Sequence, residues 1–306
     1  MFTGGGCFAQ TDSLSNEYIQ KFPDKISTQL FVLNTSNDFT FDYENEDLTL
    51  DIKPNSKTTL GVSVQYDIIS FSLGFAPKFF ADNKDNKDSK MTSFGFSLFP
   101  DKWMIHFDYF YQKGMTLETE GAKVYLTGLR SKKLGGSVAY VFNKNFSVNA
   151  LAFQSERQLK SAGTFMPMLT SYYTELKGDV AEGIGGKTYF INAALSPGYS
   201  YNWVIAKKFL VAGGASLGFG FTKSVDENVN TTSLLAQASL SLSLGYNSET
   251  FYGGVLSRGT ASSHNADSNV TMGDNISYTT AFFGYRFDAP GALTREKNKI
   301  KNKYNL

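Results

Sequence analysis

An alternation of apolar and polar residues returns in segment after segment of this chain, and it constrains the fold more than any other feature. Residues 58–66 show it most clearly, because their apolar and polar positions alternate without a break. The apolar positions are Leu60, Val62, Val64 and Tyr66, and those between them are Thr59, Gly61, Ser63 and Gln65. Successive side chains of a β-strand point to opposite faces, so the alternation predicts strands with one apolar and one polar face.

The same pattern predicts an all-β fold of about twelve antiparallel strands. A first strand begins at residue 25, and the others cover residues 58–66, 69–75, 94–98, 103–112, 134–142, 146–158, 198–204, 209–221, 234–246, 251–258 and 276–287. A soluble barrel would turn its polar faces to the surrounding water, whereas a membrane barrel would turn them to a wet lumen. The alternation by itself leaves both arrangements open.

The connections between these strands favour the membrane barrel. Short connections follow Tyr66, Phe99, Phe142, Val204 and Tyr246. The alternate connections are long and polar, and they lie at residues 77–90, 113–133, 159–197, 222–231 and 259–275. Short periplasmic turns that alternate with long outer loops are typical of bacterial outer-membrane barrels. We therefore predict a transmembrane antiparallel β-barrel in contact with outer-membrane lipid.

The number of spanning strands depends on two additional alternating segments, Phe39 to Tyr43 and Leu48 to Ile52. Counting both as spanning strands gives about fourteen. We interpret them instead as an extracellular hairpin over residues 35–57, which leaves twelve, an even number as a single-chain bacterial barrel requires. Twelve strands enclose a narrow lumen. Bulky residues on the predicted inward faces favour a filled lumen, namely Met104, Phe110, Leu151, Phe153 and Phe282.

The composition excludes several other classes of protein. No run of residues is long and apolar enough for a transmembrane helix. The 29 basic and 28 acidic residues nearly cancel, so no nucleic-acid partner is expected. A single cysteine, Cys7, and two histidines provide neither a disulfide nor a predicted metal site. We expect no cofactor.

The two ends of the chain carry their own signals. Residues 1–9 resemble the remnant of a signal peptide, with residues 10–24 as a periplasmic segment; acylation of Cys7 and an ordinary disordered terminus are alternatives. The barrel is predicted over residues 25–287. Its closing strand ends in aromatic residues, as expected of a strand that barrel assembly machinery recognises. Residues 288–306 are predicted to be a basic periplasmic tail that is solvated or binds lipid headgroups or a protein partner.

The candidate site residues fall into two groups. Glu156, Arg157 and Lys160 are predicted to form an ion-pair cluster at the outer mouth of the lumen, together with Gln158 and Ser161. Residues 159–197 would either fold inward as a selective constriction or be pinned to the wall by this cluster. The other group would line the lumen and consists of His106, Asp108, Arg258 and Arg286.

A lipid hydrolase is one alternative, since some twelve-stranded outer-membrane barrels are phospholipases. Such chemistry needs a serine that a histidine activates, next to an orienting polar group. His106 is predicted to face the lumen rather than the lipid, and no serine motif accompanies it. We therefore expect no catalytic residues and no enzyme activity.

Several motifs resemble the DUF4421 family of Bacteroidota proteins. They are Tyr140 to Asn143, Phe146-Ser147, the block from Gln158 to Phe165, Pro54-Asn55 and Leu60-Gly61. The resemblance spans about residues 20–290 and implies lineage and location rather than mechanism, since the family has no assigned activity. Two functions remain open: a structural or interaction barrel with a largely filled lumen and partners at its outer loops or tail, and a narrow pore or transporter for small solutes.

Overall fold

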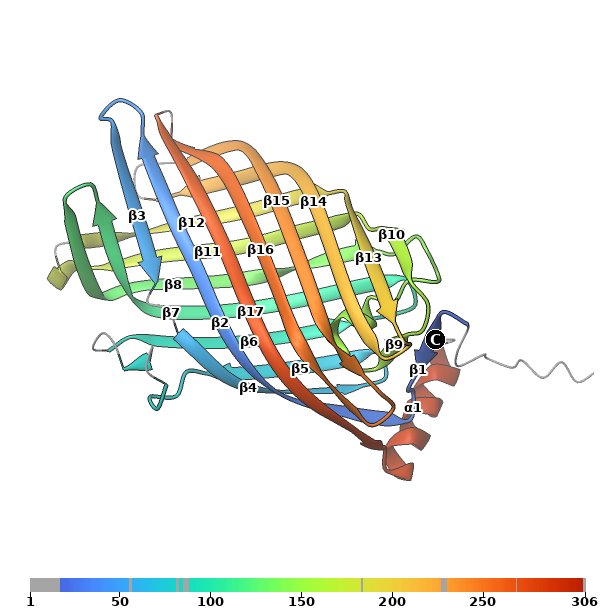
Figure 1. The fold of residues 1–306 in the computed structure, drawn as a ribbon. Helices are drawn as coiled ribbons and strands as arrows, with labels where there is room; N and C mark the ends of the chain where they lie inside the picture. The colour runs from blue at the N-terminus through green and yellow to red at the C-terminus, as the bar shows by residue number, and fades with distance from the viewer. Residues whose placement is uncertain are drawn as a thin grey trace, which may run out of the picture.

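Twelve strands close into an antiparallel barrel in the computed structural model, which describes residues 17–54, 57–80, 83–84, 88–182, 184–226, 230–267 and 269–304 (Figure 1). The predicted signal remnant, residues 1–9, lies outside these ranges. The ring consists of β2 (Lys25–Tyr43), β4 (Lys57–Tyr66), β5 (Ile69–Phe75), β6 (Lys90–Leu98), β7 (Trp103–Thr119), β8 (Ala122–Tyr140), β11 (Met168–Asp179), β12 (Ile184–Ser196), β14 (Phe209–Val225), β15 (Asn230–Asn247), β16 (Phe251–Asp267) and β17 (Val270–Asp288). The first and last of these strands pair along their whole length and close the ring.

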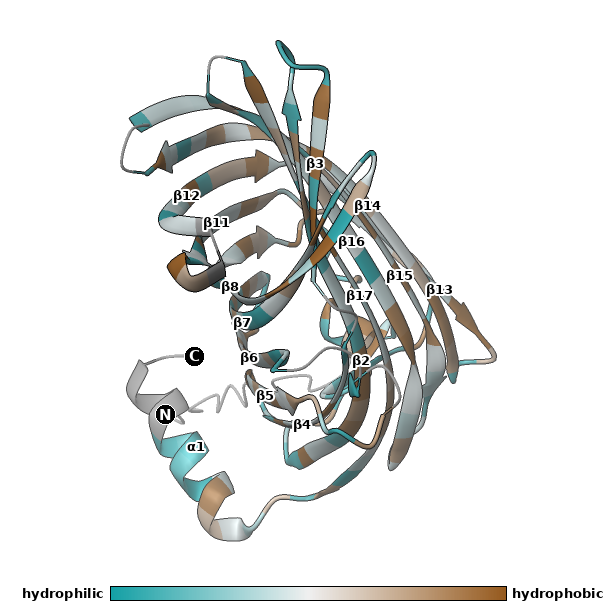
Figure 2. Cartoon of the chain, turned by 90° about the vertical axis from the view of Figure 1, so that its left-hand side faces the viewer, coloured by the Kyte–Doolittle hydropathy of each residue, from teal (hydrophilic) through white to brown (hydrophobic). Residues whose placement is uncertain are grey.

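The wall has the apolar outside and polar inside of a transmembrane barrel. Large apolar side chains are exposed on the outer face of many strands, among them Leu30, Val62, Leu73, Phe219, Leu240 and Phe283. Polar side chains at the alternate positions are buried in the lumen, among them Ser27, Ser63, Gln65, Ser93, Ser137 and Ser243. Hydrophilic and hydrophobic residues alternate along the strands in Figure 2. The predicted twelve-stranded transmembrane barrel is confirmed.

The two ends of the barrel differ, and we name them by their connections. The short-turn end carries the tight turns after β4, β6, β13 (Gly198–Ile205) and β15, and both described ends of the chain lie there (Figure 1). The long-hairpin end carries the tips of the other hairpins. There β3 (Leu48–Pro54) pairs with the end of β2 and also with β7.

Proline interrupts the chain at two places in the wall, and each time it divides a crossing of the wall into two strands. β10 (Ala162–Phe165) and β11 are separated by Met166-Pro167, and β12 and β13 are separated by Pro197. Proline has no backbone N–H, so it interrupts a ladder where it stands. Pairing with the neighbouring strands continues past each proline, because the carbonyls of Pro167 and Pro197 accept hydrogen bonds from the N–H groups of Tyr140 and Leu217, at 3.1 and 3.2 Å.

Two predictions about residues 146–197 are wrong. Residues 146–158 were expected to be a spanning strand after a short turn at Phe142, but they hold only the short 3₁₀-helix η2 (Asn149–Ala152) and β9 (Glu156–Gln158). Residues 159–197 were expected to be a long loop, and they instead supply β10, β11 and β12. The predicted total of twelve is still correct, because one strand was wrongly predicted at 146–158 and one strand was missed at 162–179.

Three of the other long connections are shorter than predicted, whereas the one predicted at residues 77–90 keeps its length between β5 and β6. Residues 113–133, 222–231 and 259–275 mostly continue the ladders of the β7–β8, β14–β15 and β16–β17 hairpins. Strands that extend past the lipid need no apolar outer face, so the alternation fades although the backbone pairing goes on.

The chain ends in a helix where a polar tail was predicted. α1 (Gly291–Tyr304) lies at the short-turn end, and Lys297 Nζ donates to Asp24 Oδ1 at 2.8 Å and to the Pro23 carbonyl at 2.9 Å. Pro290 stands just before the first turn, where its missing N–H has no intrahelical partner to lose. No helix in the described part of the chain is long and apolar enough to cross a membrane.

Candidate functional site

A segment of 21 residues, numbers 141–161, leaves the wall after β8 and folds into the short-turn end of the lumen; we call it the plug. Its apolar residues, which produced the strand-like pattern, pack inward: Phe153 is fully buried and contacts a cluster with Leu210 and Tyr252. Phe153 adopts a left-handed backbone with φ of 59°, where η2 ends. The chain thereby turns back on itself, which a spanning strand does not do.

Polar side chains attach the plug to several wall strands. The Gln154 amide donates to Ser63 Oγ at 3.0 Å, and Ser27 Oγ donates to the Gln154 carbonyl at 2.9 Å. Ser243 Oγ donates to the Leu151 carbonyl at 3.1 Å. The plug is therefore bonded to β2, β4 and β15, with β16 and β17 between β15 and β2 in the ring.

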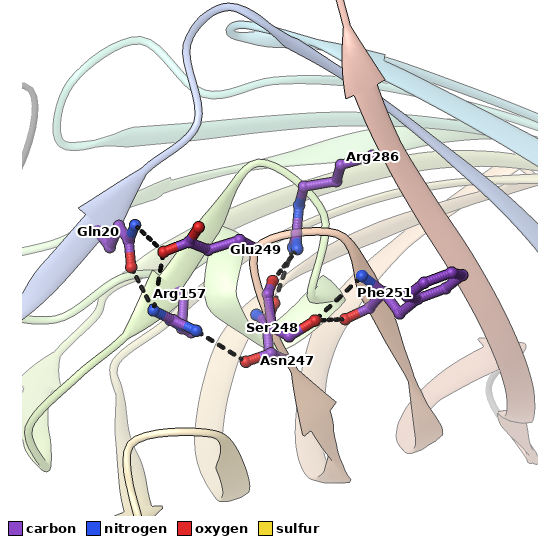
Figure 3. Close-up of polar contacts among 7 residues, drawn as sticks. All are labelled: Gln20, Arg157, Asn247, Ser248, Glu249, Phe251 and Arg286. Atoms are coloured by element: carbon purple, nitrogen blue, oxygen red, sulfur yellow. Dashed lines mark hydrogen bonds and ion pairs between the residues drawn. The ribbon is translucent and has the colours of Figure 1, made fainter.

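Arg286 on β17 is the central attachment. Its side chain is 1% exposed, and it donates to the plug carbonyls of Phe153 and Gln154. It also donates to the Ser248 carbonyl at 2.5 Å and to Asn247 Oδ1 at 2.8 Å (Figure 3). The guanidinium lies between two aromatic rings, 4.3 Å from the centroid of Phe22 and 4.5 Å from that of Tyr252.

This arginine has no carboxylate within ion-pair distance among the residues that the structure describes. Its charge is instead solvated by carbonyl and amide oxygens and by ring faces, which a planar guanidinium with five donors can contact together. Charge-assisted hydrogen bonds are stronger than neutral ones. Arg286 thus binds the plug, the β15–β16 turn and the N-terminal segment to one wall strand.

The predicted ion-pair cluster does not form, and its members are at the opposite end of the barrel from the predicted outer mouth. Arg157 contacts Gln20 and lies 4.0 Å from Glu249 (Figure 3). Lys160 Nζ donates to Glu17 at 2.7 Å. The plug turns back into the lumen instead of leaving it, and this reversal, which periodicity does not reveal, carries these side chains to the short-turn end.

The remaining members of that group hold the plug together. Glu156 accepts from Ser147 Oγ at 2.5 Å and lies 3.9 Å from Lys21 Nζ. Burial raises the pKa of the Glu156 carboxyl, against the opposing effect of the Ser147 hydrogen bond. Gln158 donates to the Asn145 carbonyl at 2.6 Å, and Ser161 Oγ accepts from the Val204 N–H at 2.9 Å.

A chamber of about 300 Å³, lined by polar and apolar side chains, lies in the lumen beside the plug. His106 Nδ1 is 2.6 Å from Ser97 Oγ, and His106 Nε2 is 2.8 Å from Asp108 Oδ1. The other oxygen of Asp108 accepts from the Tyr172 hydroxyl at 2.9 Å. A proton on Nε2 that faces the carboxylate leaves Nδ1 to accept from the serine.

These side chains have the connectivity of a serine–histidine–aspartate triad. Ser97 and His106 are register partners on β6 and β7, and the sequence analysis missed this serine because it paired no strands. The group faces the interior of the barrel, whereas the lipid lies outside the wall. A lipid substrate in the membrane therefore does not reach Ser97.

Arg258 borders the same chamber with few partners. Its hydrogen bonds within the described chain are long, to the Tyr278 hydroxyl at 3.5 Å and to the sulfur of Met168 at 3.7 Å. Nearer the long-hairpin end, Lys133 donates to both carboxylate oxygens of Asp274, at 2.8 and 3.1 Å. The sequence analysis also missed this buried pair, because its two residues are 141 positions apart.

Apolar side chains pack together on the long-hairpin side of the lumen, and we call them the apolar layer. Its buried members come from seven strands and are Phe39, Ile52, Met115, Leu126, Leu129, Leu176, Phe190 and Met272. Four of them are at most 2% exposed: Phe39, Met115, Phe190 and Met272. The lumen is thus filled at two levels by different chemistry.

The model of the family described as "Domain of unknown function (DUF4421)" matches residues 10–287. The chain belongs to this family. The predicted resemblance over about residues 20–290 is therefore confirmed. No curated protein matches this DUF4421 chain.

Solved structures that are similar to this DUF4421 chain are outer-membrane proteins of low sequence identity. The outer membrane protease OmpT of Escherichia coli is 11% identical with a TM-score of 0.38, over 88% of this chain and 98% of that one. An outer membrane channel from Pseudomonas putida F1 is 8% identical with a TM-score of 0.37, over 86% and 96%. OprG of Pseudomonas aeruginosa is 13% identical with a TM-score of 0.30, over 88% and 98%.

The structure brings the predicted site residues into two places. His106, Asp108 and Arg258 border the chamber, and Arg286 joins Arg157 through Asn247 at the plug. Lys160 and Ser161 lie at the end of the plug, where their partners are Glu17 and Val204. No group of His, Cys, Asp and Glu side chains in the described ranges is arranged to hold a metal ion.

Proposed function

We propose that this chain is an outer-membrane barrel with a closed lumen, which acts as a structural or interaction barrel and neither conducts solutes nor catalyses a reaction. The short-turn end would face the periplasm and the long hairpins the outside, as in other bacterial barrels. The filling of the lumen at two levels carries this proposal: Arg286 binds the plug to the wall at one level, and the apolar layer packs at the other.

Two features of the lumen favour a closed barrel rather than a narrow pore. An ion that entered from the short-turn end would meet the plug, which is bonded to several wall strands. An ion that passed it would meet the apolar layer, and bringing a charge into apolar surroundings is strongly unfavourable. Interaction would then occur at the surfaces outside the lipid, on the long hairpins or on α1.

Conductance of the full chain in planar bilayers tests the proposal. We expect no steady current from protein that shows heat-modifiable migration on gels, in bilayers where a general porin conducts. The Arg286→Ala variant should also stay closed, because the apolar layer remains. A steady current from folded wild-type protein would contradict the proposal and favour the pore.

A further inference from the structure

A cavity of about 550 Å³ opens at the long-hairpin end, above the apolar layer. Its lining is mixed, and the larger, apolar part includes Phe41, Leu50, Ile52, Leu129, Leu176 and Phe190. Three of these six belong to β2 and β3, so the hairpin that the sequence set apart from the spanning strands forms one wall of the cavity. We call this cavity the mouth.

The size and lining of the mouth match those of a small-molecule site. Ligand pockets usually have volumes of about 300–1,000 Å³ and are mostly apolar, with a few polar groups that orient the ligand. The apolar layer closes the mouth from below, so a molecule that enters from the long-hairpin end stops there. Displacing water from this lining stabilises an apolar ligand at about 25 cal/mol for each Å² buried.

One polar group in the lining has no partner. The hydroxyl of Ser224 on β14 is buried and makes no hydrogen bond within the described part of the chain. A buried hydroxyl without a partner is unfavourable, so a ligand group that hydrogen-bonds to it gains affinity. The Ser224 hydroxyl therefore favours a ligand that has a hydrogen-bonding group in addition to its apolar surface.

The charges at the rim favour an uncharged ligand. Lys187 is 2.8 Å from Glu175, so its ammonium group is already paired. Asp226 and Asp267 also line the rim, and their carboxylates oppose an anion. An ammonium ligand would have to give up hydration for an apolar floor.

We propose that the mouth binds an uncharged, largely apolar small molecule that carries a hydrogen-bonding group. The site lies above the apolar layer and shares no side chain with the plug. Its floor includes Ile52, Leu129, Leu176 and Phe190 of the apolar layer, so the site rests on that part of the proposed function. Ligand binding reports on the mouth and conductance on the whole lumen, so the two experiments distinguish the failure of one proposal from the failure of the other.

Calorimetry with 1-naphthol tests the site, using the full chain in lipid nanodiscs and empty nanodiscs as the reference. We expect saturable binding beyond the partition into lipid, and none for naphthalene-1-sulfonate, which has the same rings and a negative charge. Equal heats with loaded and empty nanodiscs would overturn the proposal. Equal binding of the sulfonate would overturn the preference for an uncharged ligand.

Two tryptophan substitutions on β16 distinguish the mouth from the outer wall. Ala266 lines the mouth, so Ala266→Trp should fill part of it and weaken binding at least tenfold. Ala261 is exposed on the same strand, so Ala261→Trp should leave binding unchanged. Ser224→Ala should weaken binding about two- to tenfold, the usual effect of one hydrogen bond. Unchanged binding by folded Ala266→Trp protein would place naphthol elsewhere and overturn the site.

Discussion

The two ends of the lumen contain side chains of opposite chemistry. At the short-turn end a continuous segment, the plug, is held to the wall by directional hydrogen bonds around Arg286. At the long-hairpin end single side chains from seven strands meet in an apolar layer. Hydrogen bonds fix one geometry and leave costly unpaired groups when a partner is lost, whereas apolar packing accepts substitutions of similar volume. The two ends should therefore respond differently to substitution.

Replacing Arg286 with alanine should have the largest effect. The change leaves the Phe153 carbonyl without its donor and the Gln154 carbonyl with Ser27 alone, and an unsatisfied buried acceptor costs about 1–3 kcal/mol. We expect the plug to detach while the wall stays folded. Limited trypsin digestion measures this, because the plug contains Lys144, Arg157 and Lys160 as cleavage sites.

Arg258→Ala is the matched control, since Arg258 is also a lumen arginine but hydrogen-bonds to Tyr278 and Met168 rather than to the plug. Trypsin should cut the plug quickly in the Arg286 variant and slowly in the wild type and the control. A plug that resists trypsin equally in all three would show that Arg286 does not hold it.

Shortening a side chain in the apolar layer should have a smaller effect. Met115 is fully buried there, and Met→Ala changes in protein cores cost about 2–5 kcal/mol. We expect the low end of this range, because the adjoining mouth leaves the neighbours room to relax. Met115→Leu keeps the volume and should cost less than about 1.5 kcal/mol.

The temperature at which the compact gel band disappears measures both Met115 variants. A similar loss for Leu and Ala would mean that the layer needs one particular shape, and the contrast between the two ends would then fail.

The wall could be predicted from the sequence because its two environments impose a period of two. Lipid selects apolar residues such as Leu60 and Val62, and the lumen selects polar ones such as Ser63. The plug satisfies the same pattern for another reason: Phe146, Ala150 and Phe153 are buried inside the barrel rather than against lipid. The alternation shows that apolar side chains are removed from water. It does not show whether they lie inside the barrel or against the lipid outside.

The candidate site could be predicted less well, because it depends on which strands pair. His106 and Asp108 stand two residues apart on one strand, so their common face was visible. Ser97 and Tyr172 come from neighbouring or distant strands and join them only through the register of the barrel. Arg286 was assigned to the lumen, but its partners belong to a segment that was predicted to be wall.

The smallest expected effect concerns Glu156 in the plug, whose ionised carboxyl does not stabilise the fold at neutral pH. Burial raises the pKa of Glu156 above its unfolded value, so the folded state keeps this proton to a higher pH than the unfolded state does. Stability therefore falls as the pH rises from the unfolded pKa of about 4.3 to the folded one, and stays lower above that.

Glu156→Gln should remove this loss. We expect the variant to unfold at a slightly higher temperature than the wild type at pH 7. Below about pH 4 the two should unfold at the same temperature, because the Glu156 carboxyl is then protonated in both the folded and the unfolded protein. Lys21→Met is the companion change, because it deletes the 3.9 Å ion pair and keeps the carboxyl. If Glu156→Gln instead lowers the unfolding temperature at pH 7, the carboxylate stabilises the plug, and its closure depends on ion pairs as well as on hydrogen bonds.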